Sequence, residues 1–203
     1  MTERGWRLVS IFFSALIIFS TIAYLWITPR PREQFFQFYV LGERRMISDY
    51  YPEGKGDIPP NTQVRWYLGV TNFMGSVQYV LIRVKLGNAL TNPPNETTFA
   101  PADAPVVCEF RRVLLNNETW EFPFFWEISD RMEEGGVVYI ALNVNNESLG
   151  FQELGAEGGR NFRFIFELWT YSREEGDFIF GWYSGEERKI SWLQIWFNST
   201  IPG

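Results

Sequence analysis

An apolar stretch near the N-terminus constrains this chain more than any other feature. The twenty residues from Leu8 to Ile27 contain no charged residue, no proline and no glycine. At about 1.5 Å of rise per residue, a helix of this length is about 30 Å long, which matches the hydrocarbon core of a bilayer. The sequence therefore predicts one membrane-spanning helix, and the rest of the chain is expected to start at a membrane surface.

The rest of the chain has the size and composition of one folded domain. Of its 203 residues, 46% are hydrophobic and 18% aromatic, so the part after the apolar stretch can bury a sizeable core. The net charge is -6 and no basic stripe is present, which argues against nucleic acid as a partner. There is no histidine, so the chain lacks the commonest general base and the commonest metal ligand.

The apolar stretch is either a retained anchor or a cleaved signal peptide. A signal peptide has a shorter apolar region, about 7–15 residues, and small residues before its cleavage site. This stretch ends instead in Tyr24, Leu25, Trp26 and Ile27. Trp6 at one end, with Tyr24 and Trp26 at the other, occupy positions where interfacial aromatic residues are expected. We therefore predict a retained anchor that contacts the lipid bilayer.

Arginines on both sides of the stretch leave its orientation in the membrane open. Four N-x-[ST] motifs follow it, and they begin at Asn95, Asn117, Asn146 and Asn198. Such motifs are acceptors for N-glycosylation of exported domains, although polar turn residues can match the pattern by chance. The motifs favour a single-pass protein of the cell membrane, with its N-terminus inside and its C-terminal domain extracellular.

Alternation of apolar and polar residues with period two predicts antiparallel strands in this domain. The predicted strands are residues 34–41, 64–70, 79–86, 106–115, 120–128, 137–144, 162–168, 178–182 and 191–197. Pro123 predicts an edge position for its strand, because proline lacks the N–H that an interior strand uses. Residues 129–134 are expected to form a helical turn, residues 72–75 a hairpin turn, and residues 149–159 a glycine-rich loop.

Many short strands, with no long amphipathic helix after the anchor, predict an all-β fold. We expect an immunoglobulin-like antiparallel β-sandwich of about 8 strands, preceded by one N-terminal transmembrane helix. The predicted division is a cytoplasmic N-terminus at residues 1–7, the membrane helix at 8–27, a linker at 28–34 and an extracellular β-sandwich at 35–203.

The order of several segments resembles an archaeal family. The membrane span is followed by FFQFYVLG, the pair Tyr51-Pro52, VRWYLGVTN and VQYVLIRVKL, and later by FRFIFELWTY and SWLQIWFNST. In this order they are similar to the archaeal membrane-anchored family known as domain of unknown function 1616. Two loops depart from the family pattern, at Gly56 and at residues 72–75. The resemblance implies a surface-exposed β-sandwich on a membrane tether, and it implies no activity.

No set of residues in the sequence specifies a chemical reaction. Cys108 lies in a predicted strand, and no histidine is available to activate it, so a buried structural thiol is the better interpretation. The acidic residues at 130–134 and 174–177 could supply oxygen ligands for calcium, but neither segment has the spacing of a calcium-binding loop. Two carboxylates could also hydrolyse a glycoside, but no pair stands out. We predict that the protein is not an enzyme and holds no cofactor or metal.

Tryptophans near the C-terminus supply the strongest indication of function. If the apolar residues of strands 162–168 and 191–197 face the core, Trp169, Trp192 and Trp196 face outward. An exposed aromatic stripe is a contact surface for a protein or a glycan, unless it is a second packed face. We predict a membrane-anchored extracytoplasmic module with a structural or protein-interaction role, in the cell envelope or as an accessory subunit of a larger membrane or surface complex. The alternative is a module that binds glycans or a surface layer through exposed aromatics.

Overall fold

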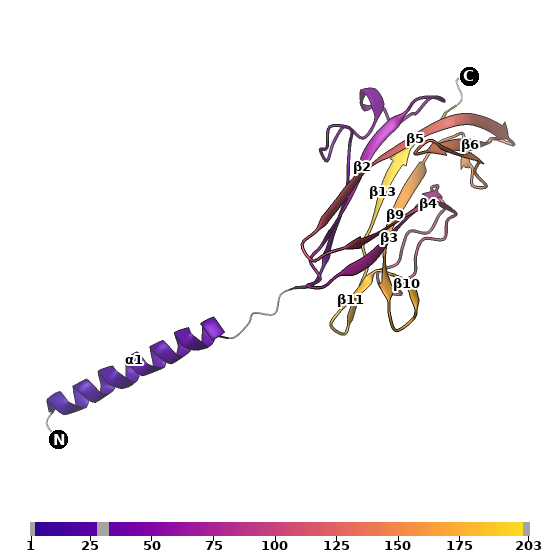
Figure 1. Ribbon diagram of the computed structural model, residues 1–203. Helices are drawn as coiled ribbons and strands as arrows, with labels where there is room; N and C mark the ends of the chain where they lie inside the picture. The colour runs from indigo at the N-terminus through magenta and orange to yellow at the C-terminus, as the bar shows by residue number, and fades with distance from the viewer. Residues whose placement is uncertain (1–2, 28–32, 201–203) are drawn as a thin grey trace. The chain divides into compact units, whose positions relative to one another are not determined.

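The computed structural model describes residues 3–27 and 33–200, and the chain divides into two units, Met1–Glu33 and Gln34–Gly203. The first unit contains a single helix, α1 (Glu3–Ile27), seen at the N-terminal end of the chain in Figure 1. Among the described residues, α1 is the one helix long and apolar enough to cross a membrane, with a mean hydropathy of 2.3 over Gly5–Ile27. A membrane anchor and a signal sequence both fit this finding. Most of the predicted linker, residues 28–32, and the first two residues of the predicted N-terminal segment lie outside the described residues.

The second unit consists mainly of two antiparallel sheets (Figure 1). The first sheet has the order β1-β2-β5-β6-β7, with β8 beside β6. Its strands are β1 (Phe36–Leu41), β2 (Val64–Asn72), β5 (Thr119–Glu134), β6 (Val137–Val144), β7 (Glu147–Phe151) and β8 (Ala156–Glu157). A single turn of 3-10 helix, Pro52–Gly54, lies between β1 and β2.

The second sheet has the order β10-β9-β3-β4, with β13 also beside β9. Its strands are β3 (Gln78–Gly87), β4 (Val106–Leu114), β9 (Phe162–Ser172), β10 (Asp177–Phe180) and β13 (Trp192–Phe197). A separate hairpin joins β11 (Trp182–Ser184) to β12 (Glu187–Lys189). The predicted all-β, sandwich-like fold with one N-terminal apolar helix is confirmed. The strands outnumber the prediction, because β7, β8 and β12 lie in segments that lack a clear alternation and because the predicted strand 178–182 is divided between β10 and β11.

Large aromatic side chains from both sheets form the core between them. Trp66 of β2 and Trp126 of β5 lie 5.2 Å apart between ring centroids, and Phe164 of β9 lies 5.7 Å from Trp66 and 5.0 Å from Trp126. All three are at most 1% exposed. Full burial of an apolar side chain of this kind contributes about 1.5–3 kcal/mol, so the alternation that turns these rings inward is what joins the sheets.

The structure corrects two predictions. Residues 129–134 form no helical turn, because they continue β5 and pair with β6, with an irregularity between Ile128 and Asp130. The strand that contains Pro123 is an interior strand of its sheet. However, β2 pairs with residues 119–126 of β5, whereas β6 pairs with residues 126–134. Pro123 therefore lies where β5 has a neighbour on one side only. The sheet loses no hydrogen bond there through the N–H that proline lacks.

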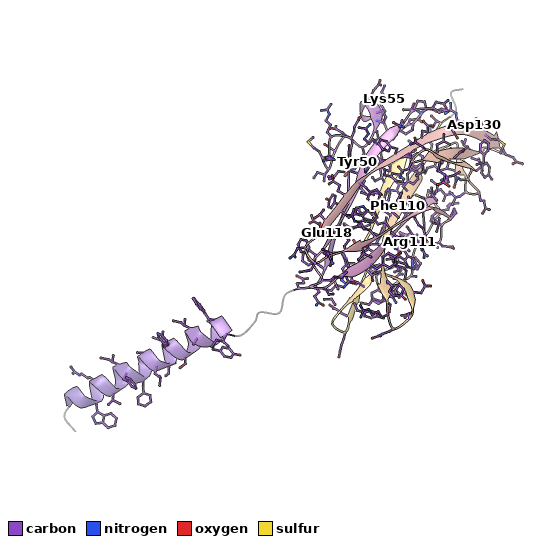
Figure 2. All side chains as sticks on the ribbon, viewed as in Figure 1. Tyr50, Lys55, Phe110, Arg111, Glu118 and Asp130 are labelled. Atoms are coloured by element: carbon purple, nitrogen blue, oxygen red, sulfur yellow. The ribbon has the colours of Figure 1, made fainter. Side chains whose placement is uncertain are left out.

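One end of the sandwich holds the start of β1 and the β2–β3 and β4–β5 turns; we call it the Phe35 end. Figure 2 shows Glu118 at this end, and Lys55 and Asp130 at the opposite one. The fully buried Asn72 joins the two turns, because its side-chain Nδ2 donates to the carbonyls of Ser76 and Leu114, at 2.8 and 3.1 Å. Its backbone N–H donates to the carbonyl of Glu118 at 3.0 Å.

Candidate interaction surface

The second sheet turns one face to the core and the other away from it, and we call the latter the outer face. Directly opposite residues in neighbouring strands share a face. Trp192 lies opposite Glu167, Trp196 opposite Arg163, and Trp169 opposite Leu81. All three tryptophans therefore lie on the outer face. Trp196 is 38% exposed, whereas Trp169 and Trp192 are half-buried.

Arginines of the same face cover two of these tryptophans. The guanidinium of Arg83 lies 4.0 Å from the ring centroid of Trp169, and that of Arg163 lies 4.6 Å from Trp196. Such contacts contribute about 0.5–2 kcal/mol, depending on how far they are removed from water. Trp169 also donates its Nε1–H to Glu167 at 3.1 Å. Part of the predicted stripe is therefore already in contact with the chain itself.

The connection from β3 to β4, residues 88–105, covers the centre of the outer face. Beneath it, the ammonium of Lys85 lies 3.1 Å from the carboxylate of Glu167 and donates to the carbonyl of Ala102 at 2.7 Å. The N–H of Ala102 donates to the same carboxylate at 2.6 Å. The side chains of Lys85 and Glu167 are 6% and 0% exposed, so this is a buried ion pair with backbone partners.

Arg163 holds a second point of the same connection. One of its nitrogens donates to the carbonyl of Thr91, and another donates to Gln194 at 2.6 Å. Burial lowers the pKa of Arg163 from its ordinary value. Contacts at Thr91 and at Ala102 thus fix residues 88–105 onto the sheet.

An open part of the outer face lies toward the Phe35 end. There Tyr79 of β3 lies opposite Val113 of β4, and Tyr171 of β9 lies opposite Phe178 of β10. Their rings are in contact, since Phe178 lies 4.9 Å from Tyr79 and 5.7 Å from Tyr171. Tyr79, Val113 and Tyr171 are 38%, 54% and 41% exposed. We call these four residues the tyrosine row.

Polar and basic groups surround the tyrosine row. The guanidinium of Arg111 lies 5.5 Å from the ring of Phe178. A cavity of about 750 Å³ beside the row is lined by Tyr79, Tyr171, Gln78 and Arg173, among others. Sequence reasoning missed the row, because Tyr79 falls on what reads as the polar face of its strand. The signal that could have revealed the row is spacing: Tyr79 lies two residues from Leu81, and Tyr171 lies two residues from Trp169, so each tyrosine shares a face with that residue.

Glu109 connects the row's basic residues to the centre of the face. Its carboxylate accepts hydrogen bonds from Arg83 and Arg111, each at 2.6 Å. Desolvation raises the pKa of Glu109, but the hydrogen bonds and charges of Arg83 and Arg111 outweigh it, so the pKa lies below its ordinary value. The carboxylate is therefore ionised at neutral pH.

The four predicted glycosylation sites differ in accessibility. Asn95, Asn117 and Asn146 are exposed, and the last two lie in turns between strands with φ of 63° and 68°. Asn198 is half-buried, and its Oδ1 accepts the N–H of Asn161 at 2.8 Å. Its backbone carbonyl accepts the N–H of Ile58 at 2.8 Å. The geometry thus favours the first three as acceptors and disfavours Asn198.

Cys108 has the environment of a structural thiol. It lies in β4 opposite Val84 and packs against the core. Burial, followed by the charges of Glu147 and Glu109, raises its pKa to about 12, so the nucleophilic thiolate is scarce at neutral pH. Among the described residues, no group of three or more His, Cys, Asp or Glu side chains could hold a metal ion.

No protein-family model and no curated protein matches the chain. Among solved structures, it is similar to a β-glucosidase from Listeria innocua in complex with glucose, with 10% identity and a TM-score of 0.36, over 83% of this chain and 17% of that one. The chain thus spans only 17% of the glucosidase's length. It is also similar to the sporulation control protein Spo0M from Bacillus subtilis, with 11% identity and a TM-score of 0.28, over 79% of this chain and 90% of that one. Similarity this low carries no inference about function.

Proposed function

We propose that the protein is a membrane-anchored extracytoplasmic β-sandwich with a structural or protein-interaction role in the cell envelope or in a larger membrane complex. Support for the anchor comes from α1, since none of its apolar window is buried inside the chain. Side chains such as Phe12, Ile17 and Phe19 are more than half exposed. A bilayer would remove this apolar surface from water. Three exposed glycosylation motifs support an extracellular domain.

The proposal includes an immunoglobulin-like arrangement of the sandwich. In immunoglobulin domains, the first, second and fifth strands lie in one sheet, and the third, sixth and seventh lie in the other. Here β1, β2 and β5 are neighbours in one sheet, and β3, β9 and β13 are neighbours in the other. This order supports the assignment, with β6 to β8 as an addition to the first sheet. The strand β4 differs, because it pairs with β3 in the second sheet, whereas the fourth strand of a constant-type immunoglobulin domain lies in the first. Membership of the archaeal family named above is part of the same proposal.

The tyrosine row carries the proposal of an interaction role. Exposed tyrosines beside arginines have the composition that protein interfaces favour, because both residue types supply a large contact area and hydrogen bonds. The row lies on a face that is fixed by the buried Lys85–Glu167 ion pair and by cation–π contacts, so a partner would bind there at a small cost in conformational entropy. Binding would then consist of burying aromatic surface, with no bond made or broken.

Photo-crosslinking in native membranes tests the interaction role. A photoreactive phenylalanine analogue at Tyr171 is expected to give a discrete covalent adduct with another envelope component. The matched control is Phe151 of β7, which is 45% exposed against 41% for Tyr171 but lies in the other sheet. Adducts that are absent, or equal at both positions, would contradict the proposal.

Mass spectrometry of the extracted native chain tests the anchor, which requires that residues 8–27 be retained.

The second proposed function is glycan binding at the same place. The cavity beside the tyrosine row favours it, because Gln78 and Arg173 place polar groups next to the two tyrosine rings. Sugar rings stack on aromatic faces and take hydrogen bonds from such neighbours. A glycan array separates the two proposals. Binding that Tyr171→Ala abolishes and Phe151→Ala preserves would favour a glycan.

A further inference from the structure

The strand β4 forms a long free edge. Among the strands that the structure describes, only β3 pairs with β4, which ends the second sheet. With 9 residues, β4 is the longest strand at a sheet edge, since β1 and β13 have 6 each and β7 has 5. An edge strand presents unpaired N–H and C=O groups that can pair with a strand from another chain.

The edge is regular over most of its length. The shift in register opposite Val84 and Lys85 is confined to the first residues of β4, between Val106 and Cys108. A bulge of this kind usually blunts an edge, but here it leaves Cys108–Leu114 regular. Arg111 and Arg112 are exposed along that part, and like charges in neighbouring copies would oppose pairing. Pairing therefore requires a register that brings opposite charges together.

One symmetric register does so. When two copies of β4 pair antiparallel about a two-fold axis at Phe110, Glu109 of each copy lies opposite Arg111 of the other. An axis at residue 109, 111 or 112 would place like charges opposite each other, and an axis at 108 would leave Glu109 and Arg111 opposite uncharged residues. Opposite charges directly across a strand pair are favourable. The sequence of β4 is thus complementary to itself in a single register.

The side chains concerned are free to make this contact. Glu109 and Arg111 both point to the outer face, and their side chains are 27% and 51% exposed. Each oxygen of Glu109 already accepts one hydrogen bond, from Arg83 or from Arg111, and each can accept another. The five N–H donors of Arg111 likewise exceed what its ion pair with Glu109 uses.

We propose that β4 pairs with β4 of a second copy of this chain, which joins the two second sheets into one continuous sheet. The inference goes beyond the proposed function, because it concerns the strand edge and not the tyrosine row. Strand pairing alone buries less than the ~1,200 Å² of a stable interface, so dilute chains associate weakly. Confinement of the chains to one membrane raises their local concentration and favours the pair.

Disulfide trapping tests the register. Full-length chains that carry Cys108→Ala are reconstituted into liposomes, one with Glu109→Cys and one with Arg111→Cys. Directly opposite residues of antiparallel strands have Cα atoms about 4.5–5.5 Å apart, which suits a disulfide. The mixture is expected to form disulfide dimers several-fold more abundantly than either chain alone. Equal yields in the mixture and in the single chains would overturn the proposal.

A charge reversal tests the same contact without cysteines. Energy transfer between labelled full-length chains in liposomes is expected to fall severalfold with Arg111→Glu, because Glu109 then faces a like charge. Arg173→Glu, the same charge change on the β9–β10 turn, is expected to leave the transfer unchanged. Equal transfer in the two variants would refute the inference. Loss of photo-crosslinks at Tyr171 would leave this result untouched, so the two proposals fail separately.

Discussion

The buried ion pair between Lys85 and Glu167 leads to a prediction with a calculable size. The carboxylate of Glu167 has two oxygens for three donors: the ammonium of Lys85, the N–H of Ala102 and the indole N–H of Trp169. In Glu167→Gln, the amide keeps one acceptor oxygen and adds a donor group. Lys85 then stays buried with the carbonyl of Ala102 as its remaining partner.

Removing one partner of a buried pair costs about 3–5 kcal/mol, because the other charge is left uncompensated away from water. For a domain of this size, each kcal/mol shifts the melting temperature by about 2–4 °C. We therefore expect Glu167→Gln to lower it by about 6–20 °C. Adding Lys85→Met removes the orphaned charge, and the double variant should recover at least about 1 kcal/mol relative to Glu167→Gln alone.

A matched control lies elsewhere in the chain. Lys55 and Glu53 form an ion pair of the same types at the same distance, 3.1 Å, but their side chains are 74% and 79% exposed. Glu53→Gln should change stability by less than about 1 kcal/mol, because water screens the pair. Urea unfolding of the detergent-solubilised chain, followed by tryptophan fluorescence, measures all of these variants. If Glu167→Gln proved as mild as Glu53→Gln, the argument from burial would be wrong.

Three further predictions follow from single sites. Asn72→Ala should destabilise the chain by about 1–3 kcal/mol in the same unfolding assay, because it removes the side-chain donor of the buried carbonyl of Leu114 and of the partly buried carbonyl of Ser76. Cys108 should resist alkylation at mildly alkaline pH in the native chain and react in urea, because a raised pKa keeps the folded thiol protonated until the pH approaches about 12. Since the folded thiol holds its proton more tightly than an unfolded one, the free energy of unfolding should fall as the pH rises above the pKa of an unfolded thiol. Glycopeptide mass spectrometry of the native chain should find Asn146 occupied and Asn198 bare, and the reverse pattern would contradict the accessibility argument.

The clearest strands could be predicted from the sequence because burial of one face leaves a period-two pattern. The predicted strand at 137–144 matches β6, Val137–Val144, to the residue. In contrast, β7 and β8 are short, lie at a sheet margin and include Gly150, so their residues carry little of that pattern. Residues 129–134 misled the prediction because they are mostly exposed on a strand that extends beyond β2.

The candidate surface could be predicted only in part. Alternation placed Trp169, Trp192 and Trp196 on the outer face, where the register also puts them, and their role in contact remains a prediction. Alternation could not show which of them stays open. The exposure of Trp169 depends on cover by Arg83, which is distant from it in sequence. The exposure of Trp196 depends on cover by Arg163, which lies opposite it in the neighbouring strand.

The charged residues of the outer face show why such cover is invisible in the sequence. Arg163 and Glu167 occupy alternate positions of β9 and read as solvent-facing, yet both are at most 4% exposed. Beside their side-chain partners, they bond backbone groups of Thr91 and Ala102, and the residue type does not reveal which backbone groups these are. The charges and residues 88–105 therefore require each other: the connection buries the charges, and the charges fix the connection. Since residues 88–105 and the Lys85–Glu167 pair close this part of the face, the described residues leave the outer face open at the tyrosine row and at the margin near Trp196.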